Sequence, residues 1–573
     1  MKNYIIAALA ASAVFTGCVD KDPEQHFFPN PDVDFTYAVD GDEYKYDFYV
    51  VSSVKFNNTS SASGNFTWDF GDGTTSTEVS PVHKYEKAGI YEVKLTHETK
   101  GSKTYPLMIF DIVPMLTVNS SSTEIVEFNN TLVDFALELP NPENLRVRYD
   151  WTFPEGTTTE DGTPIETFTG YSDEQGNIEY PGKVKFSNIG SQRIDLRTYF
   201  DVDGENRRLE DSYLNVQVGC SEPAPTLYYA QRKGNIKAYK LLNEVPAGTK
   251  IMPFDLGVPA GSMVFNLACA DVTAPNEEGE NEQQTWIYIL DAGKQYYYIN
   301  DEDGVLGDGQ ITAMRADGTG VNTVITNVGG AAFLDPFIGT TYNGNLYYTD
   351  RNTGTSTVGL TTRGAVQGKK SSTERDSYAF QNNTIPYYGR GIAYGAISNG
   401  LIRDSQGYWW WGKKYNGEGI YRFKDTDVYA TQTEAEKAPL PTPVLLPGVK
   451  MSTFAIDEDR QALYTWRAPD NQGFVHYDLP AYSTSTINEV KFITAEADPV
   501  NTTDAERVFI TQMAVDKETG RVFFCYRPDS GDESGIATGI NYYDPADNKI
   551  HKYGEDKDLG SGIVINPNKT KLF

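Results

Sequence analysis

An aromatic loop between residues 382 and 394 carries the side chains best suited to hold a ligand. It combines Tyr387 and Tyr388 with Arg390, beside Pro386 and two glycines. Aromatic rings stack on sugars or planar ligands, and a guanidinium adds a fixed positive fork. The loop therefore predicts a ligand-binding site. The alternatives are packing of these rings in a core and a structural salt bridge from Arg390.

Tryptophans in two predicted strands are second-rank candidates for the same role. The run Tyr408-Trp409-Trp410-Trp411 is typical of a strand, whose alternate rings point to opposite faces, so at least two of them belong to a core. Trp411 and Trp466 could each turn outward at a strand end and contact a ligand. Core packing is the alternative for both.

An acidic run near residue 300 is a weak candidate for calcium. Asp301, Asp303 and Asp308 surround glycine turns, as the oxygen ligands of hard cations do. An EF-hand loop counted from Asp301 would need glutamate at its twelfth position, where Thr312 stands. A solvated hairpin is the alternative, and no other cofactor is expected.

Catalytic and transition-metal signatures are missing from the sequence. It contains no Gly-x-Ser-x-Gly elbow, no Cys-x-x-Cys and no closely spaced histidine pair among its five His. Besides Cys18, the cysteines are Cys220, Cys269 and Cys525, so at most one disulfide can form within the chain. We therefore expect neither an enzyme nor a zinc or redox site.

Length, charge and composition limit the fold and the partners. A chain of 573 residues is too long to fold around one hydrophobic core, so three or four domains are expected. The net charge of −30 disfavours nucleic acid, whose phosphates it would repel. The 38 Tyr, 28 Phe, 51 Gly and 29 Pro favour short strands joined by tight turns. We therefore expect an all-β protein.

The N-terminus has the pattern of an exported lipoprotein. Lys2 precedes an apolar run from Tyr4 to Phe15, which is too short for a transmembrane helix of about 20 residues. The tail Val14-Phe15-Thr16-Gly17-Cys18 resembles a bacterial lipobox, with Phe15 where the family usually has an aliphatic residue. That resemblance implies a signal peptide over 1–17 and lipidation of Cys18. An ordinary signal peptide with an incidental cysteine is the alternative.

The residues after Cys18 are acidic. Asp20, Lys21, Asp22 and Glu24 lie in a tether over 18–29 that resembles the surface-export signal of Bacteroidota lipoproteins. The resemblance implies a lipid anchor in the outer membrane and a protein that faces the extracellular side. A solvated tether without export function is the alternative.

Residues 30–114 contain three separated motifs of one domain family. Trp68-Asp69-Phe70-Gly71-Asp72-Gly73-Thr74 comes first, Pro81-Val82-His83-Lys84-Tyr85 second, and Gly89-Ile90-Tyr91-Glu92-Val93-Lys94-Leu95 third. In this order they resemble the PKD domain, an immunoglobulin-like β-sandwich. Trp68 and Phe70 alternate onto one face of a strand, and we expect Ile90, Val93 and Leu95 to supply apolar positions of the opposing sheet.

A second, more divergent copy is expected over 115–219. Trp151-Thr152-Phe153 parallels the first tryptophan motif, and Phe186 followed by Gly190 parallels Tyr85 followed by Gly89. A polar insertion separates the two motifs of this copy. We expect a PKD-like sandwich in which the insertion is a tolerated loop, with a partner contact as the alternative.

Beyond a proline-rich segment, expected to be a hinge over 220–225, residues 226–573 repeat one strand pattern. Apolar runs ending in Asp or Asn begin at Phe454, Met513 and Ile563, and each is followed by an aromatic or apolar pair. Units of this size resemble the blades of a β-propeller, and six or seven fit the length. Closure by pairing of the two ends is expected, with its register open. Extra sandwiches are the alternative fold.

Lipoprotein signals, two sandwiches and a propeller together resemble the accessory surface lipoproteins that work beside SusC/SusD-type TonB-dependent importers. This resemblance implies capture of a nutrient, whether glycan, peptide or cofactor, by the propeller and transfer to the importer. A polysaccharide-degrading propeller enzyme and an adhesion protein are the alternatives. The inference depends on architecture, because one fold hosts many functions.

Overall fold

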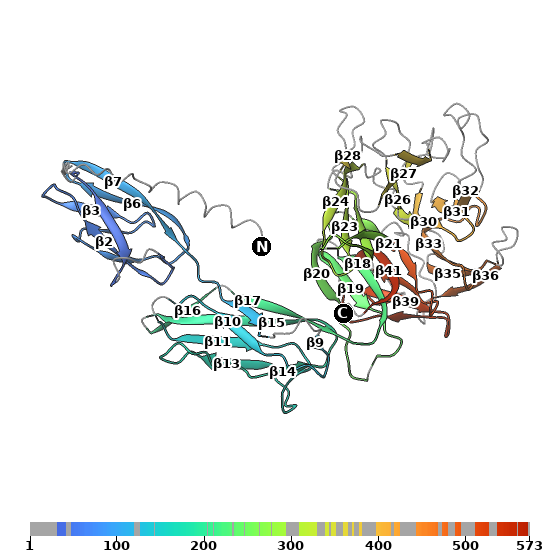
Figure 1. The fold of residues 1–573 in the computed structure, drawn as a ribbon, viewed down its shortest axis with the longest axis horizontal. Coiled ribbons are helices and arrows are strands. Elements are labelled where there is room, and N and C mark those ends of the chain that lie inside the picture. Colours follow the sequence, from blue (N-terminus) through green and yellow to red (C-terminus); the bar gives the residue numbers. More distant parts are fainter. Residues whose placement is uncertain are drawn as a thin grey trace.

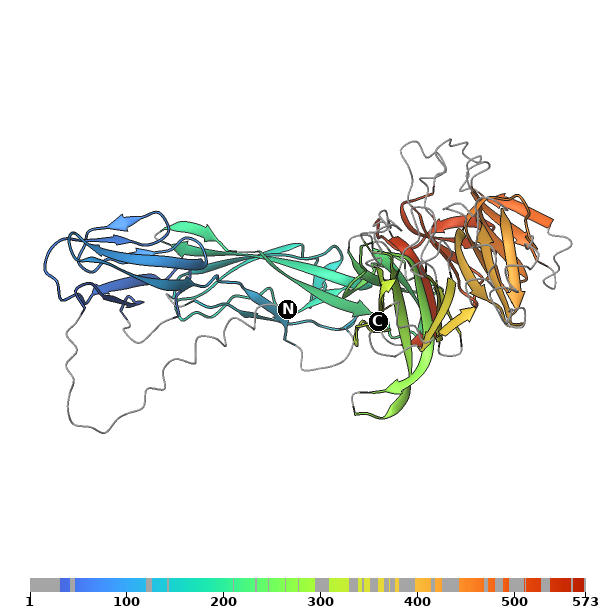
Figure 2. The same ribbon diagram turned by 90° about the horizontal axis from the view of Figure 1, so that it is seen from above.

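The computed structural model describes the chain in segments: residues 31–41, 47–119, 126–141, 144–202, 204–209, 211–231, 234–245, 247–262, 264–276, 278–293, 309–328, 339–342, 345–350, 359–364, 370–371, 377–380, 397–413, 418–424, 443–467, 473–479, 488–493, 510, 512–526, 536–557 and 560–570. Every regular element in them is a β-strand, which confirms the all-β prediction. Within these segments we find no helix with the length and apolar character needed to span a bilayer. Two sandwiches lie in line, and the propeller follows at one end (Figures 1 and 2).

The first sandwich has the two sheets that its motifs predict. One sheet has the strand order β1-β2-β5 and the other the order β4-β3-β6-β7. Their bounds are β1 (Phe35–Val39), β2 (Ser53–Asn58), β3 (Phe66–Asp69), β4 (Thr75–Ser76), β5 (Val82–Lys84), β6 (Gly89–His97) and β7 (Gly101–Ile109).

Trp68 lies at the centre of this sandwich, as predicted. Its side chain is fully buried, its ring meets Phe35 edge-on with centroids 5.0 Å apart, and its Nε1 donates to the Glu78 carbonyl at 3.0 Å. Val93 and Leu95 are buried as expected, but Ile90 is 66% exposed. The expectation for Ile90 is wrong because an odd spacing from Val93 puts it on the other face of the same strand.

The second sandwich is larger than the first. Its main sheet runs β13-β11-β15-β17-β9, with β16 paired to β15, and β10-β8 and β12-β14 form two short ladders. The bounds are β8 (Met115–Val118), β9 (Val126–Glu127), β10 (Phe135–Glu138), β11 (Val147–Thr152), β12 (Thr157–Thr159), β13 (Thr167–Tyr171), β14 (Val184–Phe186), β15 (Gly190–Val202), β16 (Glu205–Arg208) and β17 (Ser212–Gly219).

The polar insertion of this sandwich is structured. It contains β12 and also β13, which pairs antiparallel with β11 from Arg148↔Tyr171 to Thr152↔Thr167. The expectation of a tolerated loop is therefore wrong. Alternation within Thr167–Tyr171 leaves only Phe168 and Gly170 inward, so the strand lacks the apolar pattern by which it could be recognised in the sequence.

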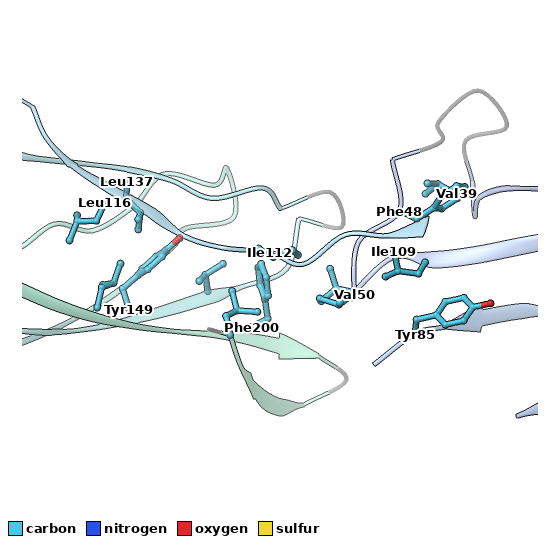
Figure 3. Packing of buried hydrophobic residues seen from close by; sticks show 14 of the residues in the cluster. Val39, Phe48, Val50, Tyr85, Ile109, Ile112, Leu116, Leu137, Tyr149 and Phe200 are labelled. Atoms are coloured by element: carbon cyan, nitrogen blue, oxygen red, sulfur yellow. The ribbon is translucent and has the colours of Figure 1, made fainter. Parts of the chain in front are cut away.

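The apolar cores of the two sandwiches are continuous. Phe48, Val50 and Ile109 of the first sandwich belong to the same buried cluster as Ile112 of the connection and Phe200 of the second sandwich. Figure 3 shows these side chains in one row across the junction. Because separating the sandwiches would expose this row to water, the junction resists bending.

The second sandwich also docks on the propeller. Ile189 makes a parallel bridge with Ile251. The Ile189 N–H donates to the Lys250 carbonyl at 3.1 Å, and the Ile189 carbonyl accepts from the Met252 N–H at 2.8 Å. Ile189 is fully buried in the propeller core, and Lys250 pairs with Glu155 at 2.6 Å.

The proline-rich segment is not the hinge that was expected over 220–225. Ala224 already begins strand β18 and pairs with Thr570. The ammonium of Lys240 also binds the Cys220 carbonyl. The prolines therefore lead directly into the propeller core.

The described strands after residue 223 form antiparallel meanders, two of which are joined into one seven-stranded sheet by a parallel pair at Asn399↔Thr453. They are β18 (Ala224–Gln231), β19 (Asn235–Lys240) and β20 (Phe254–Pro259) with β41 (Gly560–Thr570); β21 (Val264–Pro275), β22 (Asn281–Asp291), β23 (Gly309–Arg315) and β24 (Asn322–Val328) with β28 (Lys370–Ser371); β25 (Gly339–Tyr342), β26 (Asn345–Asp350), β27 (Gly359–Gly364) and β29 (Ser377–Phe380); β30 (Ile397–Arg403), β31 (Tyr408–Lys413) and β32 (Gly419–Lys424); β33 (Met451–Asp457), β34 (Ala462–Arg467), β35 (Gly473–Asp478) and β36 (Asn488–Ile493); and β37 (Met513–Val515), β38 (Val522–Tyr526), β39 (Gly539–Asp544) and β40 (Lys549–Lys552).

The first strands of these meanders contact one another in a closed ring. Going round, β41 contacts β21, and β25, β30, β33 and β37 follow before the ring returns to β41. β41 pairs antiparallel with β18, with Tyr228 opposite Val564. The C-terminal strand therefore supplies the first strand of the meander that β18 continues, and this pairing gives the closure register.

Buried acidic turns explain the sequence repeat. Asp404 accepts from the Tyr408 N–H and from the Trp410 indole, both at 2.7 Å. Asp457 and Asp516 accept from backbone N–H groups in the equivalent turns after β33 and β37. A carboxylate at this position fixes the hairpin, which is why an Asp ends the first apolar run of each of these units.

Candidate functional site: the central channel

The ring of first strands surrounds a cavity of about 300 Å³. Every one of these strands, or the residue just before it, contributes to the wall: Asn266, Leu267, Ala268, Cys269, Ala270, Asp271, Thr340, Thr341, Leu401, Ile402, Phe454, Gln512, Met513, Val564, Ile565 and Pro567. The first strands β30 and β33 pair at Asn399↔Thr453, whereas the described parts of the other first strands have an inner edge without a strand partner, so their backbone can offer donors and acceptors to the channel. The cavity therefore combines aliphatic side chains with polar backbone.

Two side chains form hydrogen bonds with part of this backbone. Gln512 accepts from the N–H of Leu267 and of Ile563, each at 2.9 Å, and donates to the Leu267 carbonyl at 2.9 Å. The Thr341 hydroxyl donates to the Cys269 carbonyl. These contacts join β21 to β41 and to β25, so Gln512 and Thr341 hold the ring together at the channel wall.

Asp271 is the one carboxylate among the described lining residues. Its oxygens accept from the Asn568 amide at 2.9 Å and from the Thr285 hydroxyl at 2.7 Å, while the residue remains exposed. It can therefore accept a further hydrogen bond or attract a cation. No His, Lys or Arg accompanies it in the described wall, so this part of the cavity has no acid–base pair.

Cys269 lies in the same wall as a neutral thiol. Burial, with a further contribution from Asp271, raises the pKa of Cys269 to about 12. Cys220, Cys269 and Cys525 are all free, so these three form no disulfide. At neutral pH Cys269 is protonated and is a poor nucleophile or soft-metal ligand.

Most of the sequence-predicted sites lie outside the described residues. These are the lipidation site Cys18, the export residues Asp20, Lys21, Asp22 and Glu24, the calcium candidates Asp301, Asp303 and Asp308, and the loop residues Tyr387, Tyr388 and Arg390. The described residues themselves contain no cluster of three His, Cys, Asp or Glu that could hold a metal.

Trp411 and Trp466 do not turn outward. Trp411 is 2% exposed and stacks on Tyr421 with centroids 4.5 Å apart, and Trp466 is 3% exposed and packs on Tyr526. Each lies inside its strand, so the expectation of an outward ring at a strand end is wrong for both. Their aromatic surface is used in the packing of the blades.

The channel residues were not among the sites predicted from the sequence. Asp271, Thr341 and Gln512 belong to no motif, and they come from strands far apart in the chain. The available signal was positional, because each lies in or beside the first strand of a meander, the strand that faces the axis of a propeller.

Comparison with known proteins identifies the first sandwich. Residues 40–105 match the family model of the PKD domain. The chain is 54% identical over 41 residues to the collagenase ColQ1 of Bacillus cereus, covering 7% of this chain and 4% of that protein. It is 33% identical over 171 residues to the collagenase ColA of another Bacillus cereus strain, covering 28% and 15%. It is 32% identical over 109 residues to the pre-pro-metalloprotease PrtV of Vibrio cholerae, covering 18% and 12%. The chain thus spans a small part of these relatives.

The chain is also similar to solved structures, each at low identity. A quinonprotein alcohol dehydrogenase-like protein of Bacteroides thetaiotaomicron has 15% identity and a TM-score of 0.30, covering 78% of this chain and 98% of that one. A gluconolactonase of Xanthomonas campestris has 13% identity and a TM-score of 0.29, covering 60% and 90%. AztD of Citrobacter koseri has 11% identity and a TM-score of 0.23, covering 74% and 98%.

Proposed function

We propose that this protein is a lipid-anchored surface protein that captures a nutrient in the channel of its propeller and works beside a SusC/SusD-type importer. The channel cavity carries this proposal. It is about 300 Å³ in volume, within the lower range of small-molecule sites, and it joins an apolar wall to a few polar groups. A glycan, peptide or cofactor fragment of that size is the expected ligand.

The composition of the wall favours binding over turnover. Asp271 has no acid or base partner among the described lining residues, and Cys269 is held as a neutral thiol. A hydrolase of glycosidic bonds would need two carboxylates flanking the bond. We therefore infer a binding protein, and the alternatives are a polysaccharide-degrading enzyme and an adhesin.

The two sandwiches support the same proposal as a stiff spacer. Their shared core and the docking of Ile189 on the propeller fix the distance between the first sandwich and the channel. A stiff spacer on a lipid anchor at Cys18 would hold the channel away from the membrane. The acidic tether with Asp20, Lys21, Asp22 and Glu24 would direct the anchored protein to the outer face.

The test combines ligand screening with variants of the channel and of the loop. The purified protein is screened against glycan, peptide and cofactor arrays, and each ligand found is incubated for product formation. Asp271→Asn should weaken binding at least tenfold, whereas Asp317→Asn, an exposed turn residue on another hairpin, should leave it unchanged. The triple substitution of Tyr387, Tyr388 and Arg390 by Ala tests whether the loop belongs to the site. Product formation would favour the enzyme, and full affinity in Asp271→Asn would place the ligand elsewhere.

Two further measurements test the cellular part of the proposal. Cys18→Ala should remove fatty-acid label and release the protein from membranes. Affinity purification from solubilised outer membranes should recover a TonB-dependent importer with the wild type. Equal fatty-acid labelling of the wild type and Cys18→Ala would contradict the lipid anchor. Equal recovery of an importer with an unrelated lipoprotein would contradict the partnership with the importer.

A further inference from the structure

The outward face of the main sheet in the second sandwich gathers most of the positive charge of that domain. Residues 115–219 contain 8 Lys or Arg against 19 Asp or Glu. Five of the basic residues lie on this face or at its rim: Arg146, Arg148, Arg193, Arg197 and Arg208. In a chain of net charge −30, such clustering on one flat sheet opposes the overall field.

Tyrosine rings hold three of these guanidinium groups in place. Arg148 lies 4.1 Å from the ring centroid of Tyr199, and Arg193 lies 4.2 Å from that of Tyr213. Arg146 lies 5.0 Å from the ring of Tyr171. A guanidinium stacked on a ring keeps its N–H edges available and loses less rotamer freedom when it binds a partner.

Acceptors alternate with the arginines across the same face. Asp150 binds Arg148 at 3.1 Å, Asp195 binds Arg193 at 2.6 Å, and Asp211 binds Arg208 at 2.5 Å. These pairs are solvent-exposed to between 30% and 58%, so they contribute little to folding stability. The face therefore presents a mixed array of donors and acceptors on which the fold depends little.

The array is elongated along β15. It occupies positions 193 to 199 of this strand, with Arg193, Arg197 and Tyr199. Tyr199 lies opposite Arg148 of β11 on one side and Arg208 of β16 on the other. At about 3.3 Å per residue this stripe is about 20 Å long. Its exposed aromatic residues, Tyr171 at 41% and Tyr213 at 57%, lie on β13 and β17, on either side of the pair β11 and β15.

We propose that this face binds an extended anionic polysaccharide, independently of the ligand in the propeller channel. Carboxylate or sulfate groups of the glycan meet the stacked arginines, and its hydroxyl groups donate to Asp150, Asp195 and Asp211. Charge complementarity favours a polyanion over a neutral chain. The alternation with aspartates favours a partner that also carries hydroxyl donors, which an acidic peptide largely lacks.

The test uses the full-length purified protein in biolayer interferometry. Polygalacturonate and dextran sulfate serve as carboxylate and sulfate probes, dextran as the neutral control, and poly-L-glutamate as the peptide polyanion. Wild type should bind one or both acidic glycans with an affinity that falls as NaCl rises, and bind dextran not at all. It should bind poly-L-glutamate at least tenfold more weakly.

The discriminating variants remove equal charge from two places in the same domain. Arg193→Gln with Arg197→Gln should weaken glycan binding at least tenfold, because both side chains are more than half exposed and leave the fold intact. Lys183→Gln with Lys185→Gln, at β14 outside the main sheet, should change it less than twofold. Arg193→Gln alone serves if the double variant melts early.

Three results would overturn the proposal. They are absence of binding to both acidic glycans, equal losses in the arginine and lysine variants, and poly-L-glutamate binding as tight as that of the glycans. The channel variant Asp271→Asn should leave binding to this face unchanged, so failure here and failure of the proposed channel function are distinguishable.

Discussion

Replacing Gly190 by alanine should separate the second sandwich from the propeller. Gly190 has a φ of +105°, and a Cβ at this residue would lie 2.0 Å from the carbonyl oxygen of Met252. That atom is backbone in the segment that pairs with Ile189, so no side-chain rotation can relieve the clash. The added methyl group must therefore push apart the two chain segments at the junction.

The docking free energy that Gly190→Ala removes can be worked out from the contacts that the junction would lose. Three backbone hydrogen bonds join residues 189–191 to 250–253, at 2.8 to 3.1 Å. At about 0.5–1.5 kcal/mol each they contribute about 1.5–4.5 kcal/mol. Burial of the fully enclosed Ile189 adds about 1.5–3 kcal/mol. Loss of about 3–7.5 kcal/mol of docking free energy is expected.

Small-angle X-ray scattering and limited proteolysis measure this outcome. Gly190→Ala should broaden the distance distribution and open new cleavage sites near residues 189–191 and 250–255. Gly182→Ala is the matched control, because Gly182 also has a positive φ but a methyl group at its Cβ position would meet no atom within 4 Å. A scattering curve for Gly190→Ala that overlays the wild-type curve would refute the rigid-junction reasoning.

Two further predictions concern the cores. Trp68→Ala should destabilise the first sandwich by about 3–5 kcal/mol, whereas Ile90→Ala, exposed on the same sheet, should change its melting little, as calorimetry can show. Burial against Tyr464 lowers the pKa of His476, partly offset by Asp478 and Asp457, so protonation favours the unfolded chain. The contribution of His476 to the free energy of unfolding should be fully present above about pH 6.5 and should fall below that pH by up to about 1.4 kcal/mol per pH unit. His476→Phe should reduce this pH dependence in thermal melts from about pH 7.5 to 5. Equal slopes in the two proteins would contradict the assignment.

Local patterns explain what could be predicted. The motif around Trp68 places two aromatic residues two positions apart before a glycine turn, and that spacing alone puts both in the core of a sandwich. The repeated Asp at 404, 457 and 516 marks hairpins because its carboxylate binds backbone within the same turn. Such signals act over a few residues, so they can be recognised without tertiary structure.

The sequence by itself therefore determined the all-β class, the PKD motif and the repeat of the propeller. Only the tertiary structure decided which strands meet. The channel wall joins Leu267 to Gln512, and closure joins Tyr228 to Val564, through contacts between residues hundreds of positions apart. The expected hinge failed for the same reason, because Ala224 is fixed by a partner near the other end of the chain. Long-range pairing of this kind depends on the packing of the whole ring, which no local pattern encodes.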